Sequence, residues 1–118
     1  MAHYIRFDTY LPTRFKDSTG VEKSVSDEEI EGFCLDIRNR FGGYTESNPA
    51  AAPPFKGWWI SKDITYTDYP ILIFTLVRLE KENEAKKFFD EWKTKLEKKL
   101  NQEFILICFF PIQILGEL

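Results

Sequence analysis

The chain has 118 residues, enough for one hydrophobic core, and we expect a single domain over residues 1–118. Hydrophobic residues make up 43% of the sequence and aromatic residues 16%, which predicts an aromatic core or interface. The formal net charge of −3 argues against general affinity for nucleic acid or for anionic membranes.

The N-terminus does not resemble a signal peptide, and no apolar run approaches the roughly 20 residues that cross a bilayer. The two cysteines, Cys34 and Cys108, each lie within an apolar pattern and do not form a C-x-x-C motif. We therefore expect a cytoplasmic protein with two buried thiols, no bound metal and no membrane partner.

The first strand is expected over residues 4–11, where side chains alternate between the two sides of an extended chain. One side carries Ile5, Phe7, Thr9 and Leu11, and the other carries Tyr4, Arg6, Asp8 and Tyr10. The alternation predicts a strand with one buried face and one polar-aromatic face. The polar residues 13–24 that follow are typical of a loop or a hairpin-like excursion.

A helix is expected to begin at Ser26, because Ser-Asp-Glu-Glu has the S-x-x-E form of a capping box. Apolar residues then recur at helical spacing and predict the face that packs on a sheet. They are Ile30, Phe33, Cys34, Ile37 and Phe41. Gly42 and Gly43 can supply the left-handed conformation that ends a helix.

Residues 44–46 begin a second strand, and residues 57–61 are expected to resume it after the proline-rich loop 48–54. Residues 63–68 are expected to form the polar turn of a hairpin. The hairpin leads into a long strand over residues 69–79, which are mostly β-branched, aromatic or leucine.

A second helix is expected from about Asn83, which has the side chain of an N-cap residue. Its apolar stripe consists of Ala85, Phe88, Phe89, Trp92, Leu96 and Leu100. The opposite face mixes lysines with carboxylates, which favours a solvated face over a phosphate site. Asn101 ends the helix, and residues 103–110 form the last strand.

The resulting order is strand, helix, strand, strand, helix, strand. It predicts an α+β fold, the ferredoxin-like βαββαβ plait, with a four-stranded antiparallel sheet and two helices on one face. The first and third strands of this plait are central, and the second face of its sheet is open unless something covers it.

The strands at residues 69–79 and 103–110 are apolar on both sides. A solvated sheet face usually alternates polar and apolar residues, and large apolar patches are uncommon on soluble monomers. Something is therefore expected to cover the second face. A second copy of the chain is favoured, and the alternatives are the loops at 13–24 and 48–55 or an apolar ligand.

Catalytic groups are scarce, and no residue is assigned as catalytic. The single histidine, His3, is next to the start of the chain, so neither a Cys-His pair nor a Ser-His-Asp set is available without it. The glycines do not form a phosphate-binding loop, and no cofactor is expected. The third strand lacks the motif of RNA-recognition domains, so nucleic acid is not expected as a partner.

The remaining candidates for ligand binding are polar and aromatic. Arg6, Asp8 and Tyr10 share the side of the first strand that faces away from the helices. Trp58 and Trp59 are neighbours on an expected strand, so one should enter the core and the other should join the second face. An ion pair between Arg6 and Asp8, or with a dimer mate, is favoured over a pocket in which these residues anchor a ligand.

Several short segments at the ends of the expected elements are similar to an uncharacterised family of small ferredoxin-like bacterial proteins, a domain of unknown function. These segments are Val25-Ser26, Phe41-Gly42-Gly43-Tyr44-Thr45, Gly57-Trp58-Trp59 and Leu100-Asn101-Gln102-Glu103-Phe104-Ile105. The resemblance covers most of residues 25–110. It implies the plait, and it implies no activity, substrate or catalytic residue.

Two functional hypotheses follow. The first is a non-enzymatic interaction or small-ligand-binding module that acts as a homodimer through the second face. The second is a small cofactor-free enzyme of the dimeric α+β barrel type, in which Arg6, Asp8 and Tyr10 anchor an apolar or aromatic substrate. Convergence of these three side chains on an enclosed cavity would favour the enzyme.

Overall fold

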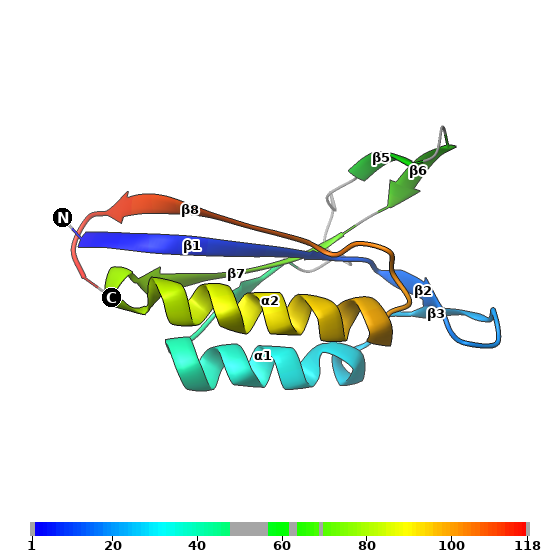
Figure 1. The fold of residues 1–118 in the computed structure, drawn as a ribbon, viewed down its shortest axis with the longest axis horizontal. Helices are drawn as coiled ribbons and strands as arrows, with labels where there is room; N and C mark the ends of the chain where they lie inside the picture. The colour runs from blue at the N-terminus through cyan, green and yellow to red at the C-terminus, as the bar shows by residue number, and fades with distance from the viewer. Residues whose placement is uncertain (1, 48–56, 62–63, 69, 118) are drawn as a thin grey trace.

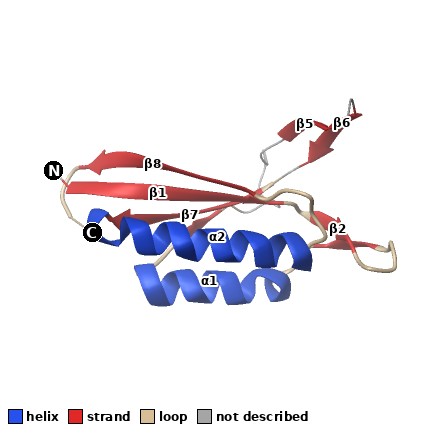
Figure 2. Ribbon diagram, in the orientation of Figure 1, coloured by secondary structure: helices blue, strands red, loops and turns tan. Residues whose placement is uncertain are grey.

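The computed structural model describes residues 2–47, 57–61, 64–68 and 70–117. Its main sheet has four antiparallel strands in the order β4-β7-β1-β8. The strands are β1 (Ala2–Leu11), β4 (Thr45–Glu46), β7 (Ile71–Arg78) and β8 (Leu106–Ile114). Helices α1 (Asp27–Phe41) and α2 (Glu82–Lys99) both lie against one face of this sheet (Figures 1 and 2). The expected α+β class, with a four-stranded antiparallel sheet and two helices, is confirmed.

The succession of strands along the chain differs from the expected one, because two further hairpins are present. One is β2 (Arg14–Lys16) with β3 (Glu22–Ser24), and the other is β5 (Gly57–Ser61) with β6 (Ile64–Asp68). The first agrees with the hairpin-like excursion expected at residues 13–24.

The second hairpin is a correction to the expected strand order. Residues 57–61 do not resume the strand at 44–46, and the expected turn at 63–68 contains a strand. The β5–β6 pair projects from the sheet on the side away from the helices (Figure 1). The residues of both segments favour extended backbone, but that preference does not specify which strand they pair with. The expected proline-rich loop at 48–54 lies outside the described residues.

Helix α1 begins and ends where the sequence predicts. The Ser26 amide donates to Glu29 Oε2 at 2.7 Å, as a capping box requires. Gly42 has φ +95°, and its amide donates to the Arg38 carbonyl at 3.0 Å, so the left-handed end is confirmed. Ile30, Phe33 and Ile37 are buried in the core.

Helix α2 has the expected apolar face and a different start. The short 3₁₀ helix η1 (Leu79–Lys81) precedes it, so Lys81 occupies the N-cap position and Asn83 lies inside the helix. Phe88, Phe89 and Leu96 are buried, and Trp92 packs at the edge of the core.

Aromatic rings fill the space between the helices and the sheet, which confirms the expected aromatic core. The Phe7 ring stacks on Phe89 with centroids 4.6 Å apart, and Phe33 and Phe41 each contact the same Phe89 ring with centroids 6.0 Å away. The Phe89 ring of α2 therefore links β1 to α1. Stacked and edge-on aromatic pairs add about 0.5 to 1.5 kcal/mol beyond their buried area.

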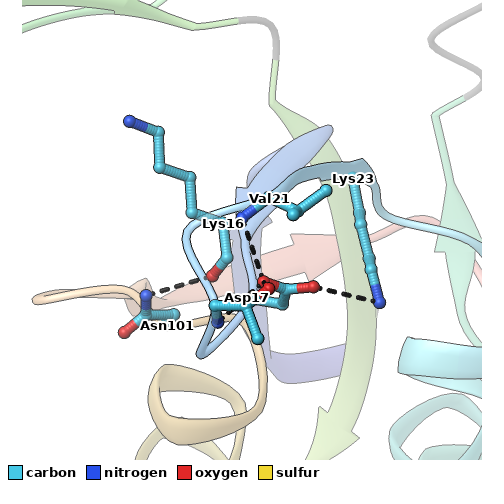
Figure 3. A network of polar contacts seen from close by, with 6 residues as sticks. Lys16, Asp17, Val21, Lys23 and Asn101 are labelled. Atoms are coloured by element: carbon cyan, nitrogen blue, oxygen red, sulfur yellow. Dashed lines mark hydrogen bonds and ion pairs between the residues drawn. The ribbon is translucent and has the colours of Figure 1, made fainter.

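The β2–β3 hairpin closes the end of the core near the C-terminus of α2. Phe15 of β2 is buried in the core, and Asn101 Nδ2 donates to the Lys16 carbonyl at 3.0 Å (Figure 3). The loop of the hairpin is organised by Asp17, whose carboxylate accepts from the Val21 amide at 3.0 Å and lies 3.3 Å from Lys23 Nζ. The hairpin lies at one end of the main sheet and does not cover the second face (Figure 1).

The last strand runs from Leu106 to Ile114, so it starts and ends later than the expected range 103–110. Pro111 lies inside it, opposite Ile5. An edge strand tolerates proline because one of its two edges forms no ladder of hydrogen bonds. β8 is such an edge strand, since β1 is its partner in the sheet.

Candidate functional site: the second sheet face

We use the name second face for the side of the main sheet that is opposite the helices. The strand register places one set of side chains there from three strands. They are Tyr4, Arg6, Asp8 and Tyr10 from β1, Leu72, Phe74 and Leu76 from β7, and Leu106, Cys108, Phe110 and Ile112 from β8. The face is therefore largely apolar around a short polar row, as the two-sided apolar strands predict.

The apolar side chains of this face are incompletely covered within the described part of the chain. Phe110 is 40% exposed, and the leucines and Phe74 from β7 are half-buried. The hairpin at 14–24 packs on the end of the core instead, and the second expected cover, residues 48–55, lies outside the described residues. An apolar sheet face with this exposure is typical of an interaction surface.

Arg6 and Asp8 form an ion pair at the centre of the face. Arg6 Nε donates to Asp8 Oδ1 at 2.6 Å, and Nη2 lies 3.3 Å from Oδ2. The Asp8 side chain is 6% exposed and that of Arg6 28%. The pairing that the sequence favoured over a ligand pocket is therefore present in the structure.

Two aromatic rings flank the Arg6 guanidinium. Its central carbon lies 3.8 Å from the ring centroid of Phe74 and 5.8 Å from that of Phe110. A cation over an aromatic face is attracted by the ring quadrupole, by about 0.5 to 2 kcal/mol depending on solvent exposure. The guanidinium is thus held by a carboxylate and by a ring from each neighbouring strand, so its position on the face is well defined.

Tyr10 and Cys108 lie near this ion pair, and both are held in their protonated forms. Burial raises the pKa of Tyr10 and of Cys108, and the negative charge of Asp8 raises both further. A thiol with a raised pKa is a poor nucleophile at neutral pH. Arg6, Asp8 and Tyr10 are thus brought together, but among the described residues none of the three lines either of two hollows beside α1.

Trp58 and Trp59 do not join this arrangement through the main sheet. Both belong to β5, which pairs with β6 in a separate two-stranded sheet. The expectation that one tryptophan enters the core and the other joins the second face assumed that residues 57–61 lie in the main sheet, and that assumption is wrong. The side chains of both residues lie outside what the structure describes.

Sequence reasoning did not identify a groove beside the outer edge of β7. The groove has a volume of about 700 Å³, and its lining includes the cationic residues Arg40, Arg78 and Lys81. These residues come from α1, β7 and η1, so no local pattern connects them. Only the arrangement of the three elements at one end of the molecule brings them together (Figure 1).

Two further observations concern other classes of function. Within the described ranges, neither helix is both long and apolar enough to cross a bilayer. Comparison of the chain with known protein families, with curated proteins and with solved structures found no significant match. Function therefore has to be inferred from the geometry of the second face and its surroundings.

Proposed function

We propose that this chain is a non-enzymatic interaction or small-ligand-binding module that acts as a homodimer through the second face. The observation that carries the proposal is the partly exposed apolar surface formed by Leu72, Phe74, Leu76 and Phe110. Burial of such surface against a second copy is favourable by about 25 cal/mol for each Å² removed from water. A two-fold dimer would place the same patch on both sides of the interface.

The electrostatics of the second face support burial. Asp8 is already shielded from water within one chain, so association does not have to remove its hydration shell. The Arg6 charge is neutralised by that carboxylate at 2.6 Å, and paired charges are much less costly to bury than isolated ones. Aromatic residues and arginine are also the types that protein interfaces favour.

The ferredoxin-like plait is part of the same proposal. When only the main sheet is counted, its strands follow the order second, third, first, fourth, with β1 and β7 in the centre. This order supports the proposed plait, which is also the fold that the resemblance to small ferredoxin-like bacterial proteins implies. Cys34 and Cys108 are free thiols, which favours a reducing compartment such as the cytoplasm.

The closed ion pair does not favour the enzyme hypothesis. Arg6 and Asp8 pair with each other at 2.6 Å, so a substrate would have to compete with an ion pair that is already formed. Tyr10 and Cys108 are held protonated by their surroundings. We therefore do not extend the proposal to catalysis by this set.

The proposal is tested by the mass of the particle in solution. Size-exclusion chromatography with light scattering should give a dimer for the wild-type chain. Phe110→Arg should weaken the dimer at least about thirtyfold, which corresponds to about 2 kcal/mol, because it places an unpaired charge in the interface. Leu35→Arg is the matched control, since Leu35 is 48% exposed on α1, away from the second face.

A wild-type monomer at high protein concentration would contradict the homodimer. Equal weakening by Phe110→Arg and by Leu35→Arg would place the interface elsewhere or indicate a general loss of folding. Circular dichroism of both variants distinguishes these two results.

A further inference from the structure

The outer edge of β7 is only partly paired. The Ser47 amide donates to the Leu72 carbonyl at 2.8 Å, and the Leu72 amide donates to Ser47 Oγ at 2.9 Å. Even-numbered residues of β7 therefore direct their backbone groups toward this edge, because those groups alternate along a strand. β4 starts at Thr45, opposite Phe74, and runs toward Leu72. Beyond Phe74, the edge of β7 has no strand partner among the described residues.

Leu76 is the residue whose backbone groups this leaves unpaired among the described residues, and Arg78, the N-cap residue of η1, lies two positions further along the same edge. Leu76 presents both an amide donor and a carbonyl acceptor to the edge, in the same register as the paired Leu72 and Phe74. An unpaired strand edge is a template for another strand. The edge faces a groove rather than flat surface, since Leu76 and Arg78 both line the hollow of about 700 Å³.

The groove has two walls. One is β7, with Tyr4 of β1 behind it, and the other is the end of α1 with the segment from Gly42 to Tyr44. The Thr75 hydroxyl donates to the Gly43 carbonyl and joins the two walls on the helix side. The wall from α1 is thus tied to β7 without occupying the open edge at Leu76.

The charge of the groove is positive in a chain whose net charge is −3. Among the described residues, its lining holds Arg40, Arg78 and Lys81 and no carboxylate side chain. Arg78 forms no ion pair within the described part of the chain. The Arg40 pair with Glu84, at 3.5 Å and half exposed, is of the weak surface type and can be exchanged for a ligand carboxylate.

We propose that this groove binds an extended acidic peptide, which adds to β7 as a short strand. The peptide backbone would exchange hydrogen bonds with the amide and carbonyl of Leu76, and its carboxylates would pair with Arg78 and Lys81. A nucleic acid fits less well, because a phosphate backbone offers acceptors to the cations but no regular donor for the Leu76 carbonyl. This site lies at the β7 edge and does not depend on the homodimer.

The binding test uses a dye-labelled short peptide of alternating glutamate and valine, with fluorescence anisotropy at low salt. Arg78→Glu should weaken binding about tenfold or more, the equivalent of one charge-assisted hydrogen bond. Lys98→Glu is the matched control, because Lys98 is exposed near the other end of α2 and the substitution changes the net charge equally. It should leave binding within about twofold of wild type.

A second arm tests strand addition without changing the protein. Methylation of alternate backbone nitrogens in the peptide removes the donors on one edge and leaves all charges in place. One of the two possible sets of methyl groups should abolish binding, and the other should be tolerated, because only one edge of the added strand faces Leu76.

Four results would overturn the proposal. They are no binding by the acidic peptide, equal weakening by Arg78→Glu and Lys98→Glu, equal binding of the two methylated peptides, and tighter binding of a single-stranded oligonucleotide than of the peptide. The third result would indicate simple attraction of an anion, and the fourth a nucleic-acid site.

Discussion

The two faces of the main sheet are made by the same strands and are packed to different degrees. On the helix side, Phe7, Ile73 and Val77 are each 1% exposed. On the second face, the alternate residues of β7 are only half-buried, although they are just as apolar. Apolar composition therefore does not by itself complete a core. The difference is the second layer, which α1 and α2 supply on one side only.

The two faces also differ in how well their polar groups are hydrogen-bonded. The second face carries the Arg6–Asp8 ion pair, in which both charges are satisfied. The helix side carries Thr9, which is fully buried and whose hydroxyl has no hydrogen-bond partner in the described structure. The side of the sheet that the helices cover therefore holds a buried hydroxyl without a partner among the described residues, whereas the charges on the second face are paired.

The largest expected change in the free energy of unfolding comes from replacing one phenylalanine on each face by alanine. Phe7→Ala should lower the free energy of unfolding by about 3 to 5 kcal/mol, because it removes a ring stacked on Phe89 and Phe109. Phe110→Ala should cost about 1 kcal/mol in the monomer, since Phe110 is 40% exposed. Denaturant unfolding at low protein concentration measures both, and Phe7→Leu serves if Phe7→Ala does not fold.

Equal losses for Phe7→Ala and Phe110→Ala in the monomer would show that the two faces are packed alike. Dimerisation would add a dependence on protein concentration on one face only. If two chains associate through the second face, the cost of Phe110→Ala should grow with protein concentration, while that of Phe7→Ala should not.

Smaller changes in the free energy of unfolding are expected for two threonines on the helix side. Replacement by valine should stabilise the protein at one position and destabilise it at the other. Thr9→Val should raise the free energy of unfolding by about 1 kcal/mol, because it removes an unsatisfied buried hydroxyl and keeps the side-chain shape. Thr75→Val should lower it by about 1 kcal/mol, because the Thr75 hydroxyl donates to the Gly43 carbonyl. Thermal or denaturant unfolding checks both. Loss of stability in both variants would mean that the Thr9 hydroxyl has a partner in solution.

The smallest effect on global stability is expected at the β2–β3 hairpin, which lies at the end of the core and is part of neither face of the main sheet. The Thr19 hydroxyl lowers the pKa of Asp17 most, and further hydrogen bonds from Val21, Thr19 and Lys23 bring it to about 2. Because this pKa lies below the ordinary value of 3.8, the stabilising contribution of the carboxylate is present above that value and is lost as the pH falls toward 2.

An NMR titration of the Asp17 carboxyl carbon measures this pKa directly. The hydrogen-exchange rate of the Val21 amide measures how well its hydrogen bond to Asp17 is kept. Asp17→Asn should speed that exchange at neutral pH with little change in global stability. A carboxyl midpoint near the ordinary aspartate value would show that the Asp17 hydrogen bonds do not persist in solution.

The elements that sequence reasoning predicted well are those whose signals are local. The Ser26 capping box, the Gly42 end of α1 and the apolar face of α2 depend on residues within a few turns of one another. The errors concern partners at a distance. Residues 57–61 were correctly expected to be a strand and wrongly placed in the main sheet, because β propensity does not specify a partner. The expected N-cap at Asn83 was wrong because η1 starts the helical path earlier.

The candidate site likewise has features that local sequence predicts and features that depend on distant partners. The sharing of one strand face by Arg6, Asp8 and Tyr10 follows from the two-residue period of a strand, and the sequence alone determined it. The distance of 2.6 Å between Arg6 and Asp8, and the position of Phe74 and Phe110 around them, depend on the register of β1 with β7 and β8. That register is a tertiary property.

The class of fold, both ends of α1 and a second apolar face could be predicted from the sequence, because they follow from periodicity and short-range chemistry. The tertiary structure decided that the hairpin at 14–24 closes the end of the core, and that β4 stops opposite Phe74. It also decided that Arg40, Arg78 and Lys81 surround the open edge of β7. The physical reason is that strand pairing and the gathering of distant charges depend on long-range contacts, which no single segment encodes.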